Sequence, residues 1–265
     1  MTDRRAAFRA LHHTGRPLLL PNAWDHASAA ALAARGHPAI GTTSLGVAAA
    51  AGRPDGAAAT GAETLALARR LARLPVLLTV DVEAGFADDP ATVAGYVAEL
   101  AGLGAVGINL EDGRADGTLA DPECTADKIA AVKAAVPDLF VNARTDTWWL
   151  GVTDPLPQTL ARARAYRAAG ADGIFVPGVV DLPTLRMLTE RIDAPLNALY
   201  QPGGPGPDEL GRVGVARVST GSLLFRAALA AAVAAADAVR AAGSTAPPEL
   251  PSYAEVQGLV PADGG

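Results

Sequence analysis

Short apolar runs alternate with alanine-rich stretches of helical pattern along most of the chain. Regular alternation of strands and helices is typical of a parallel sheet in an α/β fold. Several of the apolar runs are continuous, as expected for strands covered on both faces. The predicted strands are 18–21, 39–43, 76–80, 106–110, 140–143, 173–176, 196–199 and 216–219. The predicted helices are 24–35, 60–73, 90–103, 123–136, 155–169, 181–191, 207–212 and 221–242.

Eight strand–helix units fit one closed (β/α)8 barrel of the TIM type, which needs roughly 250 residues, and the chain has 265. Asp89 and Asp154, each followed by proline, are predicted helix N-caps. Gly36, Gly104 and Gly170 stand where helices should end before the next strand. The alternative is an open doubly wound sheet. No G-x-G-x-x-G follows the first apolar run, which counts against that alternative.

The chain shows one change of composition near its end. Residues 1–243 are predicted to form the barrel domain, because strand and helix patterns continue through them without a linker. Residues 244–265 are rich in proline and glycine, and they are predicted to form a tail with a possible short helix over 253–260.

Composition excludes several classes of protein. The formal net charge is −6, whereas nucleic-acid binders usually carry a basic surface. A lone Cys124 excludes a disulfide framework and a four-cysteine zinc site. The stretch 221–243 carries three charged residues among its alanines, so we expect a helix of a globular protein and no membrane span. We therefore expect a cytoplasmic protein with no nucleic-acid or membrane partner.

Acidic side chains gather after the third and fourth predicted strands. The active site of an α/β barrel lies at the carboxyl ends of its strands. Asp81 and Glu83 are two positions apart, so on an extended backbone they point the same way, and Glu111 follows the neighbouring strand. Converging carboxylates favour a hard divalent cation, Mg²⁺ or alternatively Mn²⁺. The competing interpretation is that these carboxylates cap helices.

Two further features suit an anionic substrate. Arg144, after the fifth strand, is placed to bind a substrate carboxylate or to form a salt bridge within the acidic cluster. Asn142 on the same strand is a candidate substrate contact. The segment Thr43, Ser44 and Leu45 either presents N–H groups and hydroxyls to an anion or forms an ordinary turn.

Seven motifs in order resemble the isocitrate lyase / phosphoenolpyruvate mutase superfamily over about residues 18–225. They are PNAWD, GTTSLGVAAAAGRPDG, PVLLTVDVEAGFAD, GAVGINLEDG, NARTD, AYRAAGADGIFVPG and GVARVSTG. The resemblance implies an α/β barrel whose last helix is exchanged between the subunits of a homodimer or homotetramer. It also implies Mg²⁺ and a small 2-oxo or 2-hydroxy acid that reacts through an enolate of the pyruvate type.

The resemblance also implies roles for particular residues. Asp81 corresponds to the direct metal ligand, Glu83 and Glu111 to acids that hold metal-bound waters, and Asp55 to another acid beside that site. Arg144 corresponds to an arginine that reaches the substrate oxygen. The remaining correspondences are Thr43, Ser44 and Leu45 for the segment that grips the substrate carboxylate, and Trp24 and Asp25 for residues near the site entrance.

The chain departs from the superfamily in the segment after Glu111. The lyases carry a Lys-Lys-Cys-Gly-His loop, but here GRADGTLADPEC follows the Glu-Asp pair, and Cys124 lies too far along to take the role of the lyase cysteine. The lysine of the phosphorus enzymes is replaced in a stretch that contains Gly113 and Arg114. Glu83 stands where the second acid is usually aspartate. The part of the site that selects the reaction is therefore replaced.

The sequence predicts a Mg²⁺-dependent lyase or decarboxylase that cleaves a C–C bond of a small 2-oxo or 2-hydroxy carboxylate through an enolpyruvate-like intermediate. One alternative is a P–C bond enzyme of the phosphonopyruvate mutase or hydrolase type. The other alternative is a metabolite-binding barrel without catalytic activity.

Overall fold

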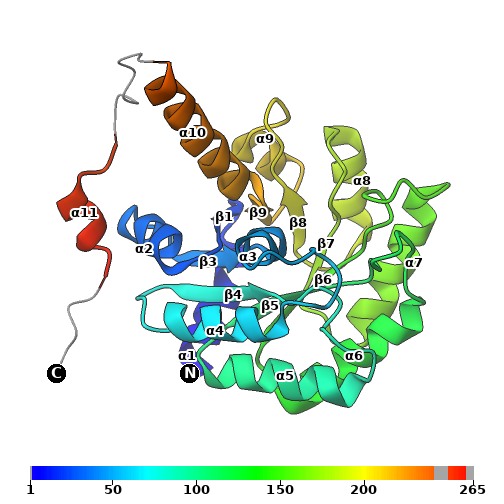
Figure 1. Cartoon of the computed structure of the whole chain (residues 1–265). Coiled ribbons are helices and arrows are strands. Elements are labelled where there is room, and N and C mark those ends of the chain that lie inside the picture. The colour runs from blue at the N-terminus through cyan, green and yellow to red at the C-terminus, as the bar shows by residue number, and fades with distance from the viewer. Residues whose placement is uncertain (1, 242–249, 261–265) are drawn as a thin grey trace.

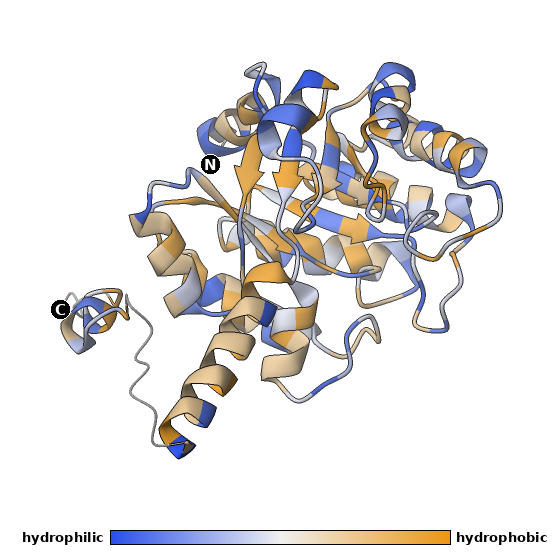
Figure 2. Ribbon diagram, turned by 90° about the horizontal axis from the view of Figure 1, so that it is seen from above, coloured by the Kyte–Doolittle hydropathy of each residue, from blue (hydrophilic) through white to orange (hydrophobic). Residues whose placement is uncertain are grey.

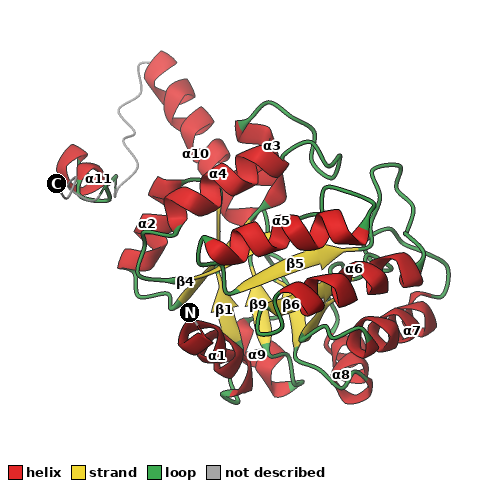
Figure 3. Ribbon diagram, turned by 90° about the horizontal axis from the view of Figure 1, so that it is seen from below, coloured by secondary structure: helices red, strands yellow, loops and turns green. Residues whose placement is uncertain are grey.

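The computed structural model describes residues 2–241 and 250–260. Within them a sheet of nine parallel strands curves into a ring enclosed by helices, as Figure 1 and Figure 3 show. The predicted single α/β barrel is thus confirmed. The strands are β1 (Leu18–Leu20), β2 (Asn22–Ala23), β3 (Ala39–Thr42), β4 (Leu77–Asp81), β5 (Gly107–Glu111), β6 (Phe140–Arg144), β7 (Gly173–Phe175), β8 (Leu196–Leu199) and β9 (Arg217–Ser219).

Most barrel strands are followed by one or more helices. The α-helices are α1 (Thr2–Ala10), α2 (His26–Ala34), α3 (Ser44–Ala50), α4 (Gly61–Leu71), α5 (Pro90–Gly102), α6 (Pro122–Ala135), α7 (Pro155–Ala168), α8 (Leu182–Arg191), α9 (Pro207–Arg212), α10 (Leu223–Arg240) and α11 (Tyr253–Gln257). The sequence did not predict α1 or α3. A short 3₁₀ helix, η1 (Leu11–His13), continues α1.

The first strand is divided, and this division closes the barrel. Pro21 separates β1 from β2; β1 pairs with β9, and β2 pairs with β3. Proline has no N–H to contribute to a sheet. Asn22 ties the two sides of the seam together. Its Oδ1 accepts hydrogen bonds from the backbone nitrogens of Thr220 and Gly221, each at 3.0 Å, and its Nδ2 donates to the Thr42 carbonyl at 2.7 Å.

The predicted helix boundaries were mostly correct. The Asp89 side chain caps α5 by accepting from the Thr92 backbone nitrogen at 2.9 Å, as predicted. Asp154 is different, because its backbone is left-handed at φ 51° and its side chain makes no capping hydrogen bond. Asp154 is the N-cap residue of α7, as predicted, but its side chain does not contribute to the cap. Helices do end at the predicted glycines, which adopt positive φ: Gly36, Gly104 and Gly170.

The amino-terminal end of the barrel is filled by apolar and aromatic side chains. Phe8 from α1 is fully buried and packs in a cluster with residues from four strand segments. His12 stacks on Phe140 with ring centroids 4.3 Å apart. We call this set the barrel plug; it consists of Phe8, His12, Leu18, Leu20, Ala39, Val106 and Phe140. The plug leaves the opposite end of the barrel as the open one.

Helix α10 extends away from the barrel, as Figure 1 and Figure 2 show, and residues along it are mostly apolar. Phe225 near its start is buried, whereas Leu229 and Val233 are exposed. Across the described residues, helices of the length and apolar character that a membrane span requires were not found. Helix α11 lies within the stretch predicted to form a short helix. Of the predicted tail, residues 250–260 are described, whereas 244–249 and 261–265 lie outside the described residues, as do 242 and 243 of the predicted barrel domain.

Candidate active site

A pocket opens at the carboxyl ends of the strands, where a barrel active site is expected. Its volume is about 160 Å³. Residues from the strand ends, from the start of α3 and from the start of α10 line it. They are Asn22, Thr42, Thr43, Ser44, Leu45, Asp55, Asp81, Asn109, Arg144, Trp149, Phe175, Pro177, Leu199, Ser219, Gly221 and Ser222.

Asp81 is the acidic group at the end of β4. Its backbone nitrogen donates to Thr42 Oγ1 at 2.9 Å, which fixes the strand end, and its Oδ1 accepts from the Glu83 backbone nitrogen at 3.1 Å. Burial raises the pKa of the Asp81 carboxyl, the positive charge of Arg144 opposes that rise, and the negative charge of Asp55 adds to it. A cation in this pocket would therefore stabilise the ionised form of Asp81.

Glu83 does not continue the strand direction of Asp81. Strand β4 ends at Asp81, and Glu83 has a left-handed backbone at φ 50°. Its carboxylate accepts from Thr60 Oγ1 at 2.8 Å and from the Ala58 backbone nitrogen at 3.0 Å. The expectation that Asp81 and Glu83 point the same way along an extended strand was therefore wrong. Both Glu83 oxygens hold the loop that precedes α4.

Arg144 is engaged by two carboxylates. Its Nη1 lies 2.8 Å from Glu111 Oε2, while Nε and Nη2 donate to the two oxygens of Asp146 at 2.6 and 3.1 Å. One face of the guanidinium lies over the Phe175 ring, 5.6 Å from its centroid. The salt bridge considered for Arg144 is thus present. The guanidinium also lines the pocket, so the same group faces the site.

Glu111 completes this charged group at the end of β5. Burial raises the pKa of Glu111 to about 8, against the favourable charge of Arg144 and together with repulsion from Asp81, Asp146 and Asp55. Glu111 contacts Arg144 and is not among the residues that line the pocket. Burial is the largest cause of this rise, and the charge of Arg144 offsets it only in part.

Asp112, next to Glu111, is a structural residue. It is fully buried and accepts from Tyr166 Oη at 2.6 Å, from Arg162 Nη1 at 3.0 Å and from the Asp146 backbone nitrogen at 2.9 Å. A buried carboxylate is costly unless it is paired, and these three hydrogen bonds supply its partners. They also hold the carboxylate in one position. Asp112 thereby fixes the loop after β6, which carries Asp146.

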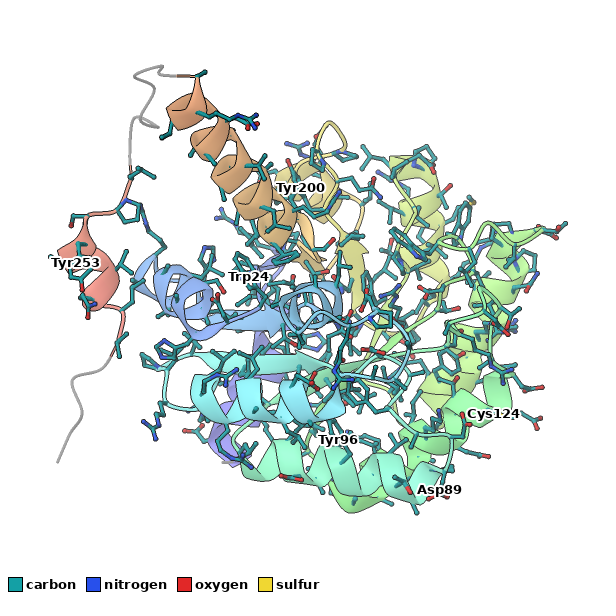
Figure 4. The ribbon with its side chains drawn as sticks, viewed as in Figure 1. Trp24, Asp89, Tyr96, Cys124, Tyr200 and Tyr253 are labelled. Atoms are coloured by element: carbon teal, nitrogen blue, oxygen red, sulfur yellow. The ribbon has the colours of Figure 1, made fainter. Side chains whose placement is uncertain are left out.

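The segment 43–45 forms the start of a helix. Thr43 precedes α3 and makes no side-chain capping bond, and Thr43, Ser44 and Leu45 all line the pocket. Gly46 lets the first turn of α3 lie close to Trp24, since a Cβ at position 46 would fall 2.7 Å from the Trp24 Cβ. The ring of Trp24 packs edge-on against the ring of Phe225, with ring centroids 5.4 Å apart, between α2 and α10 (Figure 4).

The other expected contacts lie in different places. Asp55 lines the pocket from the loop between α3 and α4. Asp25 caps α2 by accepting from the Ser28 backbone nitrogen at 2.7 Å, and neither Asp25 nor Trp24 is among the lining residues. Asn142 is buried under the pocket, where it donates to Asn109 Oδ1 at 2.9 Å.

The donor set suits a hard cation bound by few protein ligands. In the described part of the chain, no three His, Cys, Asp or Glu side chains form a metal-binding group. Asp81 is the carboxylate that both lines the pocket and sits at a strand end, and Asp55 lines the same pocket. Mg²⁺ commonly takes one or two carboxylates and several waters. The residues therefore fit Mg²⁺.

Sequence reasoning missed two residues at this end of the barrel. Trp149 lines the pocket and is 56% exposed. Arg217 on β9 is 1% exposed and donates to Asn109 Oδ1 at 3.0 Å, beneath the pocket, and burial lowers its pKa to about 9. The sequence held a signal for each: Arg217 stands within an apolar run, and Trp148 and Trp149 form an aromatic pair after the fifth predicted strand. Cys124 is exposed on α6, away from the pocket (Figure 4).

The fold and the pocket define an α/β barrel of the enzyme type, with a charged site at the carboxyl ends of its strands. The model of the phosphoenolpyruvate phosphomutase family matches residues 8–240. The chain belongs to this family, which confirms the resemblance to the isocitrate lyase / phosphoenolpyruvate mutase superfamily.

Three similar proteins illustrate the range of the family. An uncharacterized protein of Mycobacterium tuberculosis is 48% identical over 251 residues, 95% of each chain. The 2-methylisocitrate lyase of Salmonella typhimurium is 33% identical and covers 83% of this chain and 79% of its own. A phosphonopyruvate hydrolase solved with oxalate and Mg²⁺ has a TM-score of 0.84 at 24% identity, covering 97% of this chain and 94% of its own. This last likeness supports the fold alone.

Proposed function

We propose that the protein is a Mg²⁺-dependent lyase or decarboxylase that cleaves a C–C bond of a small 2-oxo or 2-hydroxy carboxylate through an enolpyruvate-like intermediate. The observation that carries the proposal is the partly buried Asp81 carboxylate in the pocket, beside a guanidinium that is itself held by Glu111 and Asp146. Similarity to 2-methylisocitrate lyase supports C–C chemistry.

In this proposal Asp81 would hold the cation directly and Asp55, which also lines the pocket, would orient water beside it, whereas Glu111 acts through its ion pair with Arg144. When bound, Mg²⁺ supplies a Lewis acid that polarises the 2-oxo group and stabilises negative charge as the bond breaks. Arg144 adds a fixed positive charge close to the reacting oxygen. Its bonds to Asp146 keep the guanidinium in place, so its orientation costs nothing during the reaction.

The substrate carboxylate is proposed to bind at the start of α3. The N–H groups in the first turn of a helix lack partners within the helix, and Thr43 does not cap them with its side chain. The hydroxyls of Thr43 and Ser44 add donors at the same edge of the pocket. This position leaves the 2-oxo group near Asp81, since β3, which leads into α3, is the neighbour of β4.

The charge of the pocket favours C–C over P–C chemistry. Among the described residues that line the pocket, Arg144 is the only lysine or arginine. Its donors already contact two carboxylates, those of Glu111 and Asp146. A phosphonate carries up to two negative charges, which would need further cationic partners. A substrate with less charge on its departing group fits this lining better.

Metal-dependent turnover of a panel of 2-oxo and 2-hydroxy acids tests the proposal. We expect activity with Mg²⁺, its loss after chelation, and its loss in Asp81→Ala, whereas Asp127→Ala, at an exposed position on α6, retains it. Activity that survives chelation or the Asp81 substitution would contradict the proposal. Phosphorus-31 spectra of an incubation with phosphonopyruvate identify the P–C alternative. Binding of oxalate with Mg²⁺ but no turnover across the panel would identify a metabolite-binding barrel.

We also propose that the chain forms a homodimer or homotetramer through α10. Leu229 is 51% exposed and Val233 62% exposed on a helix that extends beyond the barrel. An apolar helix face of this kind is usually covered in a stable protein. A dimer or tetramer by light scattering at micromolar concentration is the expected result, and a monomer under those conditions would contradict it.

A further inference from the structure

The two sides of the pocket differ in chemistry. Strands β3 and β4 lie across the barrel from β7 and β8, because the strand order runs round a closed ring. The β3–β4 side presents the polar residues Thr42, Asp55 and Asp81. On the opposite side the lining is apolar. We call this side the apolar wall; it consists of Trp149, Phe175, Pro177 and Leu199.

The apolar wall is held in a fixed position. Phe175 is 4% exposed and lies against the Arg144 guanidinium. The loop that carries Trp149 is tied down at several points: the Leu150 backbone nitrogen donates to the Asp146 carbonyl at 2.8 Å, and Trp148 Nε1 donates to Thr159 Oγ1 at 3.1 Å. Trp149 itself lines the pocket and is 56% exposed, so it retains apolar surface that a ligand could cover.

This loop also packs closely against the loop after β7. Gly178 has φ 91°, and a Cβ at this position would lie 3.0 Å from the backbone of Trp148 and Trp149. The close contact allows the two loops to form one surface. An exposed tryptophan on a well-anchored loop is therefore positioned to contact a ligand, since a side chain without a ligand gains little from such anchoring.

We propose that the substrate is a 2-oxo acid with a single carboxylate and a short apolar remainder, and that the apolar wall binds this remainder. The inference rests on the proposed function, because it takes the carboxylate and 2-oxo end to lie on the Asp81 side. The wall offers no charged group to a second carboxylate, and the nearby Arg144 is already paired. Burial of apolar surface against the wall stabilises the binding of substrates that carry an apolar substituent.

This substrate class also narrows the reaction. A 2-oxo acid without a second carboxylate has no carboxyl group to lose from the departing end. Cleavage of the aldol type then fits the site better than decarboxylation does, and it requires that the remainder carry a hydroxyl on C4. The C3–C4 bond breaks, the hydroxyl proton passes to water, C4 leaves as a neutral aldehyde or ketone, and the electron pair of the broken bond stays on C3 of the pyruvate-type enolate. The pocket volume of about 160 Å³ limits the apolar remainder to a small group.

Calorimetric titration with Mg²⁺ present tests the inference on the full-length protein. The probes are pyruvate, 2-oxobutanoate and 2-oxopentanoate, together with 2-oxoglutarate as the charged counterpart of 2-oxopentanoate. We expect affinity to rise about threefold for each added methylene group, near the gain from burying one CH₂. We expect 2-oxoglutarate to bind at least about tenfold more weakly than 2-oxopentanoate, because its second carboxylate would be desolvated without a partner.

Two variants assign the effect to the wall. In Trp149→Ala the gain from pyruvate to 2-oxopentanoate should shrink, while Trp149→Phe should restore most of it. Tyr253→Ala is the matched control, since Tyr253 is an aromatic residue 80% exposed on α11 (Figure 4), and it should keep the full gain. If pyruvate and oxalate bind with Mg²⁺ but affinity does not rise with chain length, the inference is overturned. If neither binds, the proposed function fails instead.

Discussion

The two ends of the barrel are built from the same strands but from different side chains. At the amino-terminal end, the barrel plug of Phe8, Phe140 and their neighbours fills the interior with apolar surface. At the carboxyl end, Asp81, Glu111 and Arg144 occupy the last strand positions, and the interior is a charged pocket. The plug supplies stability, whereas the pocket retains carboxylates whose raised pKa values show that they are costly there.

Between the two ends lies a polar layer. Asn109 Oδ1 accepts hydrogen bonds from Asn142 at 2.9 Å and from Arg217 at 3.0 Å. The Nε and Nη1 atoms of Arg217 are buried without a hydrogen-bond partner in the described structure. The change from apolar to charged is therefore gradual, with a buried cation directly beneath the carboxylates. Substitutions at each end should have separable effects.

The largest expected effect on stability is at the plug. Phe8→Ala should lower the free energy of unfolding by about 3–5 kcal/mol, the usual cost of removing a buried phenylalanine, because Phe8 is fully buried. Urea unfolding measures this loss. Val239→Ala, at an 80% exposed position, is the control and should change little. Equal losses in the two variants would mean that the plug does not stabilise the barrel.

A smaller loss is expected from the scaffold of the charged end. Tyr166→Phe removes the 2.6 Å hydrogen bond to Asp112 and leaves that buried carboxylate with fewer donors. Hydrogen bonds to charged groups contribute about 1.5–3 kcal/mol, so unfolding by urea should show a loss in this range. Tyr253→Phe, on the exposed α11, should be neutral. A Tyr166 variant as stable as the parent would contradict the structural role given to Asp112.

The smallest effect near neutral pH is a pH dependence at the plug. Burial, with the charge of Arg217, lowers the pKa of His12 from 6.5 to about 3. The unfolded chain then binds more protons than the folded one between these values, so stability falls as pH drops through that window. His12 should account for about 1 kcal/mol at pH 6 and more at lower pH.

The substitution His12→Phe isolates this contribution. Phenylalanine can stack on Phe140 as His12 does, but it does not titrate. Thermal unfolding at pH 7.5 and at lower pH values should show a weaker acid dependence in the variant than in the parent protein. The same acid dependence in both proteins would assign the effect to groups outside the plug.

The sequence predicted the site best at positions where a charged residue stands at the end of an apolar run. Asp81, Glu111 and Arg144 could be placed because apolar runs mark the strands and a barrel has its site at their carboxyl ends. Glu83 could not, because its left-handed backbone turns the side chain to Thr60, and spacing alone does not reveal such a turn.

Contacts between distant segments were also out of reach. The position of Trp149 depends on Thr159 and on the loop around Gly178, both outside its own segment. Phe8 belongs to a helix of only nine residues, whose burial depends on the barrel end that it closes. Sequence pattern predicts helices and strands whose apolar residues recur at a regular spacing. The positions of the other segments depend on tertiary packing.

The central claim is that the charged end of the barrel binds Mg²⁺ through Asp81 together with a carboxylate ligand. Calorimetric titration of oxalate into the protein, with and without Mg²⁺, tests this claim most directly. We expect binding that requires Mg²⁺ and is lost in Asp81→Asn, whereas Asp127→Asn, at an exposed position on α6, binds oxalate as the parent protein does. Oxalate binding that is equally tight without Mg²⁺, or that persists in Asp81→Asn, would contradict it.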